Sequence, residues 1–274
     1  MPHAKLKSIR HLVLDMDGTI YLGRTLFPFT PAFFDCLRRL GIEHTFITNN
    51  CSISVDEYLL KLKGMGIEAS RDQLYTSALS TLDYLRREMP SVRRLYVLGT
   101  PSLAGEFAAA GYSIVAGEEE PEAVVISFDT GLTFERLGKA AWWVRQGKPF
   151  IATHPDQTCP TDRPTVLVDC GSICECLHAA TGRRPQAVLG KPSPLIVQAV
   201  LERHGLQPAE LAVVGDRLNT DMALARAAGV TGVLVLSGGT RREDLANAAL
   251  QPDIVVENVG ELGQLLTTAR EKAG

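Results

Sequence analysis

The 274-residue chain alternates short apolar runs with longer stretches in which apolar residues recur every three or four positions. A short apolar run bounded by polar residues or glycine is typical of a strand that is buried on both faces. The spacing of three or four is typical of an amphipathic helix. The alternation of the two patterns predicts an α/β fold built on a doubly wound, largely parallel sheet.

The two outer parts of the chain carry one set of these elements. Strands are expected at about 10–16, 43–48, 187–189, 211–215 and 232–236. Helices are expected at about 31–40, 54–64, 194–204, 220–228 and after Asn258. The segment that follows the first strand, through Gly23, is expected to be a turn region. The helix at 54–64 begins with Ser54-Val55-Asp56-Glu57, the pattern of a capping box.

The middle of the chain shows the same alternation of strand and helix patterns. Strands are expected at about 94–98, 123–128 and 149–152. Helices are expected from Ser77 or Ser80 to Met89 and at about 102–110, 134–146 and 171–181. Gly182-Arg183-Arg184-Pro185 looks like a helix end and a linker. We therefore expect a core domain formed by residues 1–79 and 184–274, with an inserted α/β domain at 80–183.

Composition narrows the class of protein. Hydrophobic residues make up 45% of the chain and charged residues 22%, as in ordinary globular proteins. The net charge of −3 gives no electrostatic reason to expect binding to nucleic acid or to an anionic membrane. No apolar stretch approaches the roughly 20 residues of a transmembrane helix, and the N-terminus lacks the apolar region of a signal peptide. These features predict a cytoplasmic protein.

The cysteines do not indicate a metal site. Cys170, Cys174 and His178 fall on one side of the helix expected at 171–181, with Cys176 between them. A site for a soft metal needs about four convergent ligands, which one helix face does not provide. We therefore interpret these cysteines as small hydrophobic residues.

The first strand ends in two aspartates, in the sequence Asp15-Met16-Asp17-Gly18-Thr19. Open α/β sheets bind their ligands at the carboxyl ends of the strands. Strand alternation sends side chains two positions apart in the same direction, so the two carboxylates start close together. Because like charges repel, this arrangement favours a hard divalent cation, with Mg²⁺ as the first choice. An ordinary turn built from Asp and Gly remains the alternative for this segment alone.

Three more polar segments follow at the ends of expected strands or at the start of a helix. Phe46 to Asn50 ends a strand in Thr48 and Asn49, which alternatively cap a helix. Gly190-Lys191-Pro192-Ser193-Pro194 places a lysine before a helix, where it could equally be a solvated loop residue. Ala212 to Asp221 ends a strand in Asp216, with Asp221 five residues later. Each of these two aspartates has a local alternative, in a turn or at a helix start.

Taken together, the four segments resemble the haloacid dehalogenase (HAD) superfamily of phosphohydrolases, whose motifs occur in the same order. The insertion between the second and third motifs is similar to a C2-type cap domain of class IIA. This group contains NagD-type nucleotide phosphatases, 4-nitrophenyl phosphatases, phosphoglycolate phosphatases and pyridoxal phosphatases. The resemblance extends over nearly the whole chain and includes Ala152-Thr153-His154-Pro155-Asp156 and Ala180-Thr181-Gly182-Arg183. Many relatives carry Asn at the position of His154 and Ser at that of Cys51. The substrates of those relatives are therefore not assigned to this protein.

The resemblance implies a Mg²⁺-dependent phosphatase that hydrolyses small phosphomonoesters through an aspartyl-phosphate. Nucleoside monophosphates, sugar phosphates, glycolate phosphate and pyridoxal phosphate all stay open as substrates, as does 4-nitrophenyl phosphate in vitro. Asp15 is then the nucleophile and Asp17 the general acid and base. Lys191 supplies a positive charge next to the phosphate oxygens and next to Asp15. The metal ligands are Asp15, the backbone carbonyl of Asp17 and Asp216, and Asp221 has a supporting role.

The residues expected to contact the substrate or its phosphate are Thr48, Asn49, Asn50, Asn219 and, from the inserted domain, His154. For His154 an ordinary loop position is an equal alternative. Asp129 and Asp156 also follow expected strands of the insertion, where loops can reach a substrate. Trp142-Trp143 fits either the core or a contact surface, and we weigh a homodimer formed through the inserted domain.

Two other functions remain open at this stage. An aspartyl-phosphate can be passed to an alcohol instead of water, which would make the protein a phosphotransferase or mutase. A non-catalytic regulator that binds a phosphorylated metabolite would be expected to lack Asp15 or Asp17, and both are present. A dehalogenase does not need the second aspartate as an acid, and a P-type ATPase needs transmembrane segments.

Overall fold

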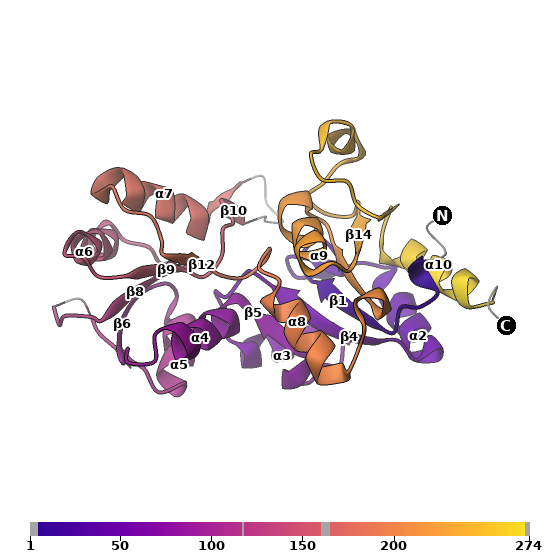
Figure 1. Ribbon diagram of the computed structural model, residues 1–274, viewed down its shortest axis with the longest axis horizontal. Helices are drawn as coiled ribbons and strands as arrows, with labels where there is room; N and C mark the ends of the chain where they lie inside the picture. Colours follow the sequence, from indigo (N-terminus) through magenta and orange to yellow (C-terminus); the bar gives the residue numbers. More distant parts are fainter. Residues whose placement is uncertain (1–4, 117, 160–164, 272–274) are drawn as a thin grey trace. The chain divides into compact units, whose positions relative to one another are not determined.

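The computed structural model describes residues 5–116, 118–159 and 165–271 (Figure 1). The chain divides into two compact units. The first contains Met1–Thr48, Lys61–Tyr75 and Lys191–Gly274, and the second contains Asn49–Leu60 and Thr76–Gly190. The second unit therefore includes residues on both sides of the segment 80–183 that we expected to be inserted.

The first unit is built on a six-stranded sheet in the order β15-β14-β13-β1-β4-β5. The strands are β1 (His11–Asp15), β4 (Glu43–Thr48), β5 (Leu74–Thr76), β13 (Leu211–Gly215), β14 (Thr231–Val235) and β15 (Ile254–Val256). β1 pairs in parallel with both β4 and β13. The strand order changes direction at β1, and such a switch point leaves a crevice at the carboxyl ends of the strands.

Helices cover both faces of this sheet. They are α2 (Thr30–Leu40), α8 (Leu195–His204), α9 (Ala223–Ala228) and α10 (Val259–Glu271), while α3 (Val55–Gly64) joins the two units along the chain. On β4, the ring of Phe46 packs against Phe34 of α2, with 5.9 Å between centroids. The next residue, Ile47, belongs instead to a core cluster with Val197 of α8 and Leu224 of α9. Because neighbouring strand residues point to opposite faces, the sheet is doubly wound, and the predicted fold class is confirmed.

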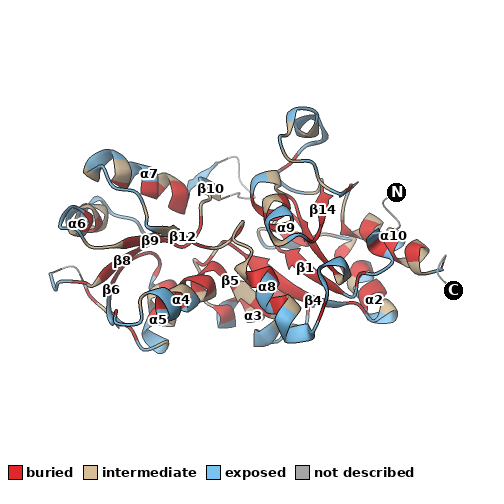
Figure 2. Ribbon diagram, in the orientation of Figure 1, coloured by how far each residue is buried: buried red, intermediate tan, exposed pale blue. Residues whose placement is uncertain are grey.

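The second unit has its own five-stranded sheet in the order β12-β9-β8-β6-β7. The strands are β6 (Arg94–Leu98), β7 (Ser113–Ile114), β8 (Ala123–Ile126), β9 (Phe150–Ala152) and β12 (Ala187–Val188), and neighbouring strands pair in parallel. β12 pairs with β9, which is why this unit continues beyond residue 183. Figure 2 shows that the middle strands β6, β8 and β9 are mostly buried, while the edge strands β7 and β12 are partly exposed and the helices expose one face.

Four helices cover the second sheet, two on each face. α4 (Ser77–Glu88) and α5 (Pro101–Ala109) supply Leu82 and Leu103 to one core cluster. α6 (Phe134–Arg145) and α7 (Cys170–Thr181) supply Val144 and Ile173 to the other cluster. Cys170 and Cys174 are buried in this second cluster, among apolar side chains.

Several short elements were not predicted. The expected turn region after β1 contains a hairpin of β2 (Tyr21–Leu22) and β3 (Thr25–Leu26). β10 (Thr158–Cys159) pairs with β11 (Leu167–Val168). Short helical turns also occur at η1 (Arg71–Gln73), η2 (Pro208–Glu210) and η4 (Arg242–Asn247). A single π-helical turn, η3 (Leu218–Met222), precedes α9, so the helix expected at 220–228 begins with a different hydrogen-bond pattern.

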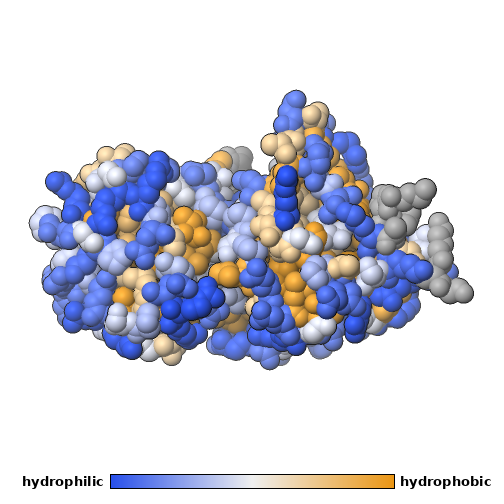
Figure 3. Space-filling view, in the orientation of Figure 1, coloured by the Kyte–Doolittle hydropathy of each residue, from blue (hydrophilic) through white to orange (hydrophobic). Residues whose placement is uncertain are grey.

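In the view of Figure 3 the surface is mostly hydrophilic, and hydrophobic side chains gather in smaller areas. Within the described ranges, no helix combines the length and the apolar character that crossing a bilayer requires. The expected cytoplasmic location stays a prediction.

Candidate active site

Polar side chains gather where three neighbouring strands of the first unit end. Asp15 is the last residue of β1, Thr48 is the last residue of β4, and Asp216 directly follows β13. Since these strands are adjacent and parallel, their carboxyl ends lie at the same edge of the sheet. All three side chains belong to buried residues. The sequence therefore brings these predicted residues to the switch point of the fold.

Lys191 lies among two of the predicted carboxylates. Its Nζ forms an ion pair with Asp15 and another with Asp221 Oδ1, at 2.7 Å. Burial by itself would lower the pKa of Lys191, but the charges of Asp15 and Asp221 raise it above its ordinary value. The side chain therefore stays protonated and keeps a positive charge beside Asp15.

Three buried carboxylates lie close together at this point. Asp15, Asp216 and Asp221 each offer an oxygen, and these oxygens lie within 4.8 Å of one another. Burial, followed by the charges of Asp15 and Asp221, raises the pKa of Asp216 to about 7. Burial also raises the pKa of Asp221 to about 6, although Lys191 opposes the shift. One lysine does not balance three carboxylates, so the cluster suits a divalent cation.

The loops around Asp216 leave space for its carboxylate. A Cβ atom added at Gly18 or at Gly238 would collide with Asp216 Oδ2. Gly18 also has a φ of +86°, a conformation that glycine adopts without strain. The Gly239 amide donates to Asp216 Oδ2 at 2.5 Å. An all-oxygen donor set held in this way fits a small, hard cation such as Mg²⁺.

Asp17 occupies a different environment from Asp15. Its Oδ1 accepts a hydrogen bond from the Gly23 amide at 3.4 Å, at the β2–β3 hairpin. Burial is the main cause that raises the pKa of Asp17 above its ordinary value. Asp15 instead accepts a hydrogen bond from the Thr19 hydroxyl at 3.1 Å, in addition to its ion pair with Lys191. Two carboxylates in unlike environments suit an acid and a nucleophile.

Asn50 and Asn219, two of the predicted phosphate contacts, lie in different local settings. Asn50 Oδ1 accepts hydrogen bonds from the Ser52 amide at 2.9 Å and the Ser52 hydroxyl at 2.7 Å. Asn219 is exposed in the π-helical turn between Asp216 and Asp221. Neither placement tests a contact with substrate, so both assignments stay predictions.

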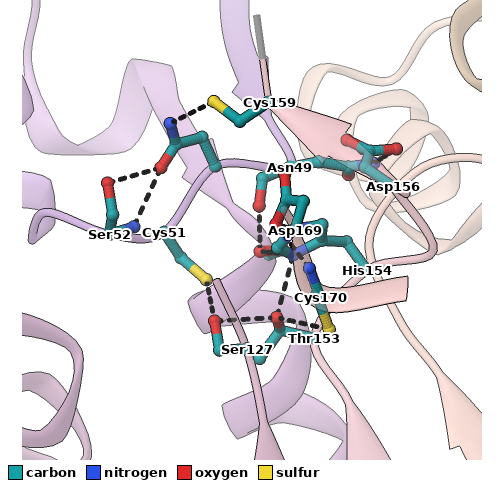
Figure 4. A network of polar contacts seen from close by, with 12 residues as sticks. Asn49, Cys51, Ser52, Ser127, Thr153, His154, Asp156, Cys159, Asp169 and Cys170 are labelled. Atoms are coloured by element: carbon teal, nitrogen blue, oxygen red, sulfur yellow. Dashed lines mark hydrogen bonds and ion pairs between the residues drawn. The ribbon is translucent and has the colours of Figure 1, made fainter. Parts of the chain in front are cut away.

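His154 lies inside the second unit, in the polar network of Figure 4. The residue is fully buried. Its Nε2 lies 2.8 Å from Asp169 Oδ1, and its Nδ1 lies 2.8 Å from the Thr153 hydroxyl. Burial alone would lower the pKa of His154, but Cys170, Asp169 and Cys51 raise it well above its ordinary value. With this placement, the contact of His154 with the substrate stays a prediction.

The same network reaches Asn49, which directly follows Thr48. Asn49 Nδ2 donates to both carboxylate oxygens of Asp156 at 3.3 Å. The Asn49 carbonyl accepts from the Ser77 hydroxyl at 2.6 Å, and that hydroxyl lies 3.5 Å from His154 Nδ1. His154 is therefore placed to position the segment of Asn49.

Gly190, which precedes Lys191, packs closely on this network. A Cβ atom at Gly190 would lie 2.5 Å from Asn49 Oδ1 and 3.2 Å from the Cβ of His154. Asp129 does not take part, because its buried carboxylate forms an ion pair with Arg136 at 2.5 Å. Sequence reasoning assigned Ser77 only a possible helix start and did not single out Asp169, because neither residue follows an expected strand or stands in a recognisable motif.

We expect His154→Ala to destabilise the protein by about 3–5 kcal/mol, because the change leaves the buried Asp169 carboxylate without its partner. The raised pKa of His154 adds stability that is fully present below its unfolded pKa of about 6.5 and is lost as the pH rises through the folded pKa. The difference in unfolding free energy between wild type and variant should therefore shrink at alkaline pH. Urea unfolding of both proteins at several pH values measures this difference in unfolding free energy.

The matched control is the double variant His154→Ala, Asp169→Asn. It removes the unpaired charge while asparagine still caps α7, so it should be more stable than His154→Ala alone. A stability difference that does not change with pH would contradict the protonated state of His154.

Comparisons with known proteins agree with this geometry. The family model of haloacid dehalogenase-like hydrolases matches residues 12–113, and a HAD-hydrolase-like model matches residues 188–262. An acid sugar phosphatase from Staphylococcus aureus is 33% identical over 256 residues, which cover 93% of this chain and 97% of the relative.

Solved structures also resemble the protein over nearly all of its length. The 4-nitrophenylphosphatase from Thermotoga maritima has a TM-score of 0.88 and 40% identity, covering 95% of this chain and 98% of that one. A glycerol phosphate phosphatase from Mycobacterium tuberculosis, in complex with magnesium, has a TM-score of 0.84 and 32% identity, with coverages of 94% and 78%. The chain therefore belongs to the haloacid dehalogenase-like hydrolase family, as a phosphoric monoester hydrolase of the class IIA, NagD-type group.

Proposed function

We propose that this protein is a Mg²⁺-dependent phosphatase that hydrolyses small phosphomonoesters through a phosphorylated Asp15. The observation that carries the proposal is the position of Asp15, which is paired with Lys191 and lies beside the carboxylates of Asp216 and Asp221. A nucleophilic carboxylate, a fixed positive charge and a cation site are the parts that phosphoryl transfer needs.

The two half-reactions use the two aspartates of the first motif. An Asp15 oxygen attacks phosphorus while the bond from phosphorus to the ester oxygen breaks, and Asp17 protonates the departing oxygen. Asp17 then takes a proton from water, which attacks the phosphorus and releases phosphate with restoration of Asp15. Burial favours the protonated form of Asp17 that the first step requires.

The metal would be held by Asp15, Asp216 and the backbone carbonyl of Asp17, with Asp221 orienting Lys191. When bound, Mg²⁺ supplies positive charge to the phosphate oxygens. Thr48 and Asn49 are proposed to donate hydrogen bonds to the same phosphate. The magnesium complex of the mycobacterial relative supports this cofactor.

Asp17→Asn should slow the hydrolysis of alkyl phosphates more than that of 4-nitrophenyl phosphate. Alkoxide leaving groups need a proton, and general acid catalysis contributes roughly 10²–10⁴-fold, whereas 4-nitrophenolate leaves readily without one. Rapid-quench measurement of the first turnover isolates this step, since the later attack of water also loses its base. Equal losses of the first-turnover rate for both substrates would argue against Asp17 as the acid.

The substrate class is proposed to be small phosphate esters, with the choice among them made by the second unit. The relatives described above include an acid sugar phosphatase and a glycerol phosphate phosphatase. A screen of phosphorylated metabolites, ranked by kcat/KM, tests this proposal. In the same screen Asp156→Ala should change the ranking, because Asp156 holds the amide of Asn49. An unchanged ranking would remove Asp156 from substrate selection.

A homodimer through the second unit is proposed from the exposed face of α6. Trp142 is 57% exposed and Phe134 is 92% exposed, whereas Trp143 packs against the core. Large exposed aromatic side chains are enriched at interfaces. We expect sedimentation velocity to show a dimer for the wild type and a monomer for Trp142→Glu. An unchanged sedimentation coefficient would place any interface elsewhere.

A further inference from the structure

Three side chains of types that can bind a metal ion meet at the amino-terminal end of the sheet in the first unit. His11 is the first residue of β1, Glu43 is the first residue of β4, and His204 is the last residue of α8. The register of the two strands places His11 opposite Glu43. One ligand atom from each residue lies within 4.8 Å of the other two. This cluster lies at the opposite end of β1 from Asp15.

The distances within the cluster suit a small metal ion. His204 Nδ1 lies 2.9 Å from Glu43 Oε2, and His11 Nδ1 lies 3.7 Å from the same oxygen. Ligand atoms bound at about 2.0–2.2 Å around tetrahedral Zn²⁺ are roughly 3.3 Å apart. The two distances lie on either side of that value, so only small side-chain shifts are required for the three residues to bind one ion.

His11 provides an independent observation that points to a ligand. The residue is 1% exposed, and its Nε2 lies 3.0 Å from the Thr45 hydroxyl. Its Nδ1 is buried and has no hydrogen-bond partner among the described residues. Leaving a buried polar atom unpaired is costly. When Nε2 donates to Thr45, the lone pair of Nδ1 is available on the side of Glu43 and His204.

The contact with Thr45 is itself a feature of metal-binding histidines. Such histidines almost always donate their second ring N–H to a fixed acceptor, which sets the tautomer and the ring orientation. Thr45 is buried on β4, two residues after Glu43, so it points to the same face of the sheet.

We propose that His11, Glu43 and His204 bind a divalent transition-metal ion of the Zn²⁺ type. Imidazole nitrogens suit Zn²⁺, whereas Mg²⁺ prefers a set of oxygen ligands, so this site and the carboxylate cluster differ in selectivity. Two histidines and one glutamate leave a fourth position for water. A pocket of about 920 Å³, which His11, Glu43 and His204 help to line, gives the ion and its water access. The ion would join the start of two central strands to the end of α8.

Calorimetric titration of the metal-stripped, tag-free protein with Zn²⁺ tests the site. Excess Mg²⁺ is present throughout to occupy the carboxylate cluster. We expect one equivalent of Zn²⁺ to bind to the wild type. Affinity should fall about 100-fold or more in Glu43→Gln and in His204→Gln, since each loses a direct ligand. These two side chains are partly exposed, at 67% and 30%, so their replacement does not open the core.

His178→Gln, which removes an imidazole from the second unit, is the matched control and should bind Zn²⁺ like the wild type. Co²⁺ in place of Zn²⁺ should give the visible absorption of a four-coordinate ion in the wild type but not in His204→Gln. Zn²⁺ should also raise the Tm of the wild type by several degrees.

Absence of Zn²⁺ binding in excess Mg²⁺ would overturn the proposal. So would wild-type affinity in both Glu43→Gln and His204→Gln. Loss of the Zn²⁺ equivalent in Asp216→Asn, with retention in His204→Gln, would assign the ion to the carboxylate cluster instead and would equally overturn it.

Discussion

Asp15→Asn is expected to lower the steady-state rate on the order of 10³-fold or more, because the amide is a poor nucleophile of nearly the same shape. Lys191 keeps its ion pair with Asp221 in this variant, so the fold should survive. The rate is measured as phosphate release from 4-nitrophenyl phosphate with saturating Mg²⁺. Acid-quenched wild-type enzyme should in addition carry one phosphoryl group on the peptide that contains Asp15.

The control for this experiment is Asp35→Asn. Asp35 lies on α2 and pairs with Arg38 at the surface, so its replacement should leave both the rate and the phosphorylated peptide unchanged. Circular dichroism and Tm establish that Asp15→Asn is folded. Retention of more than about a tenth of the wild-type rate in the Asp15 variant would exclude Asp15 as the nucleophile.

Removal of divalent metal is expected to lower the rate about a thousandfold, since a bound cation supplies several kcal/mol of charge stabilisation in phosphoryl transfer. Mg²⁺ added back should restore the rate fully. Ca²⁺ should restore little of it, because Ca²⁺ takes more ligands at longer distances and would engage both oxygens of Asp15. The measurement is phosphate release after treatment with chelator, with each metal titrated in turn.

Asp216→Asn serves as the internal comparison for the metal experiment. It removes one carboxylate from the cluster while the Gly239 amide still has an oxygen to contact. This variant should need a higher Mg²⁺ concentration for half-maximal activity. Full activity in Ca²⁺, or in the presence of chelator, would contradict the proposed coordination by Asp15 and Asp216.

The main elements of the fold could be predicted because their signals are local. The apolar run of β1 and the capping box at Ser54 and Glu57 both occur where the sequence indicated, and the Ser54 amide contacts Glu57 Oε2 at 2.7 Å. The short strands were missed for a physical reason. β5 and β15 have only three residues each, which is too few for a recognisable pattern, and they are defined by pairing with distant strands.

The residues of the candidate site likewise fall into those that the sequence indicated and those that it did not. Asp15, Lys191 and Asp216 could be found because each stands at a strand end or before a helix, where sequence position alone indicates the edge of the sheet. The environment of His154 could not be found. It depends on Asp169, fifteen residues away, and on Ser77, which precedes it by seventy-seven residues. Contacts of this kind arise from tertiary packing, so no local or periodic pattern in the sequence indicates them.

The crowding of Asp15, Asp216 and Asp221 has an evolutionary consequence. Buried like charges lower stability, so replacement of one of them by a neutral residue relieves repulsion and at the same time removes part of the site. Selection for thermal stability alone would therefore tend to favour such replacements and would give stable variants with low activity. The crowded carboxylates therefore predict that stability and activity change in opposite directions when one of them is neutralised.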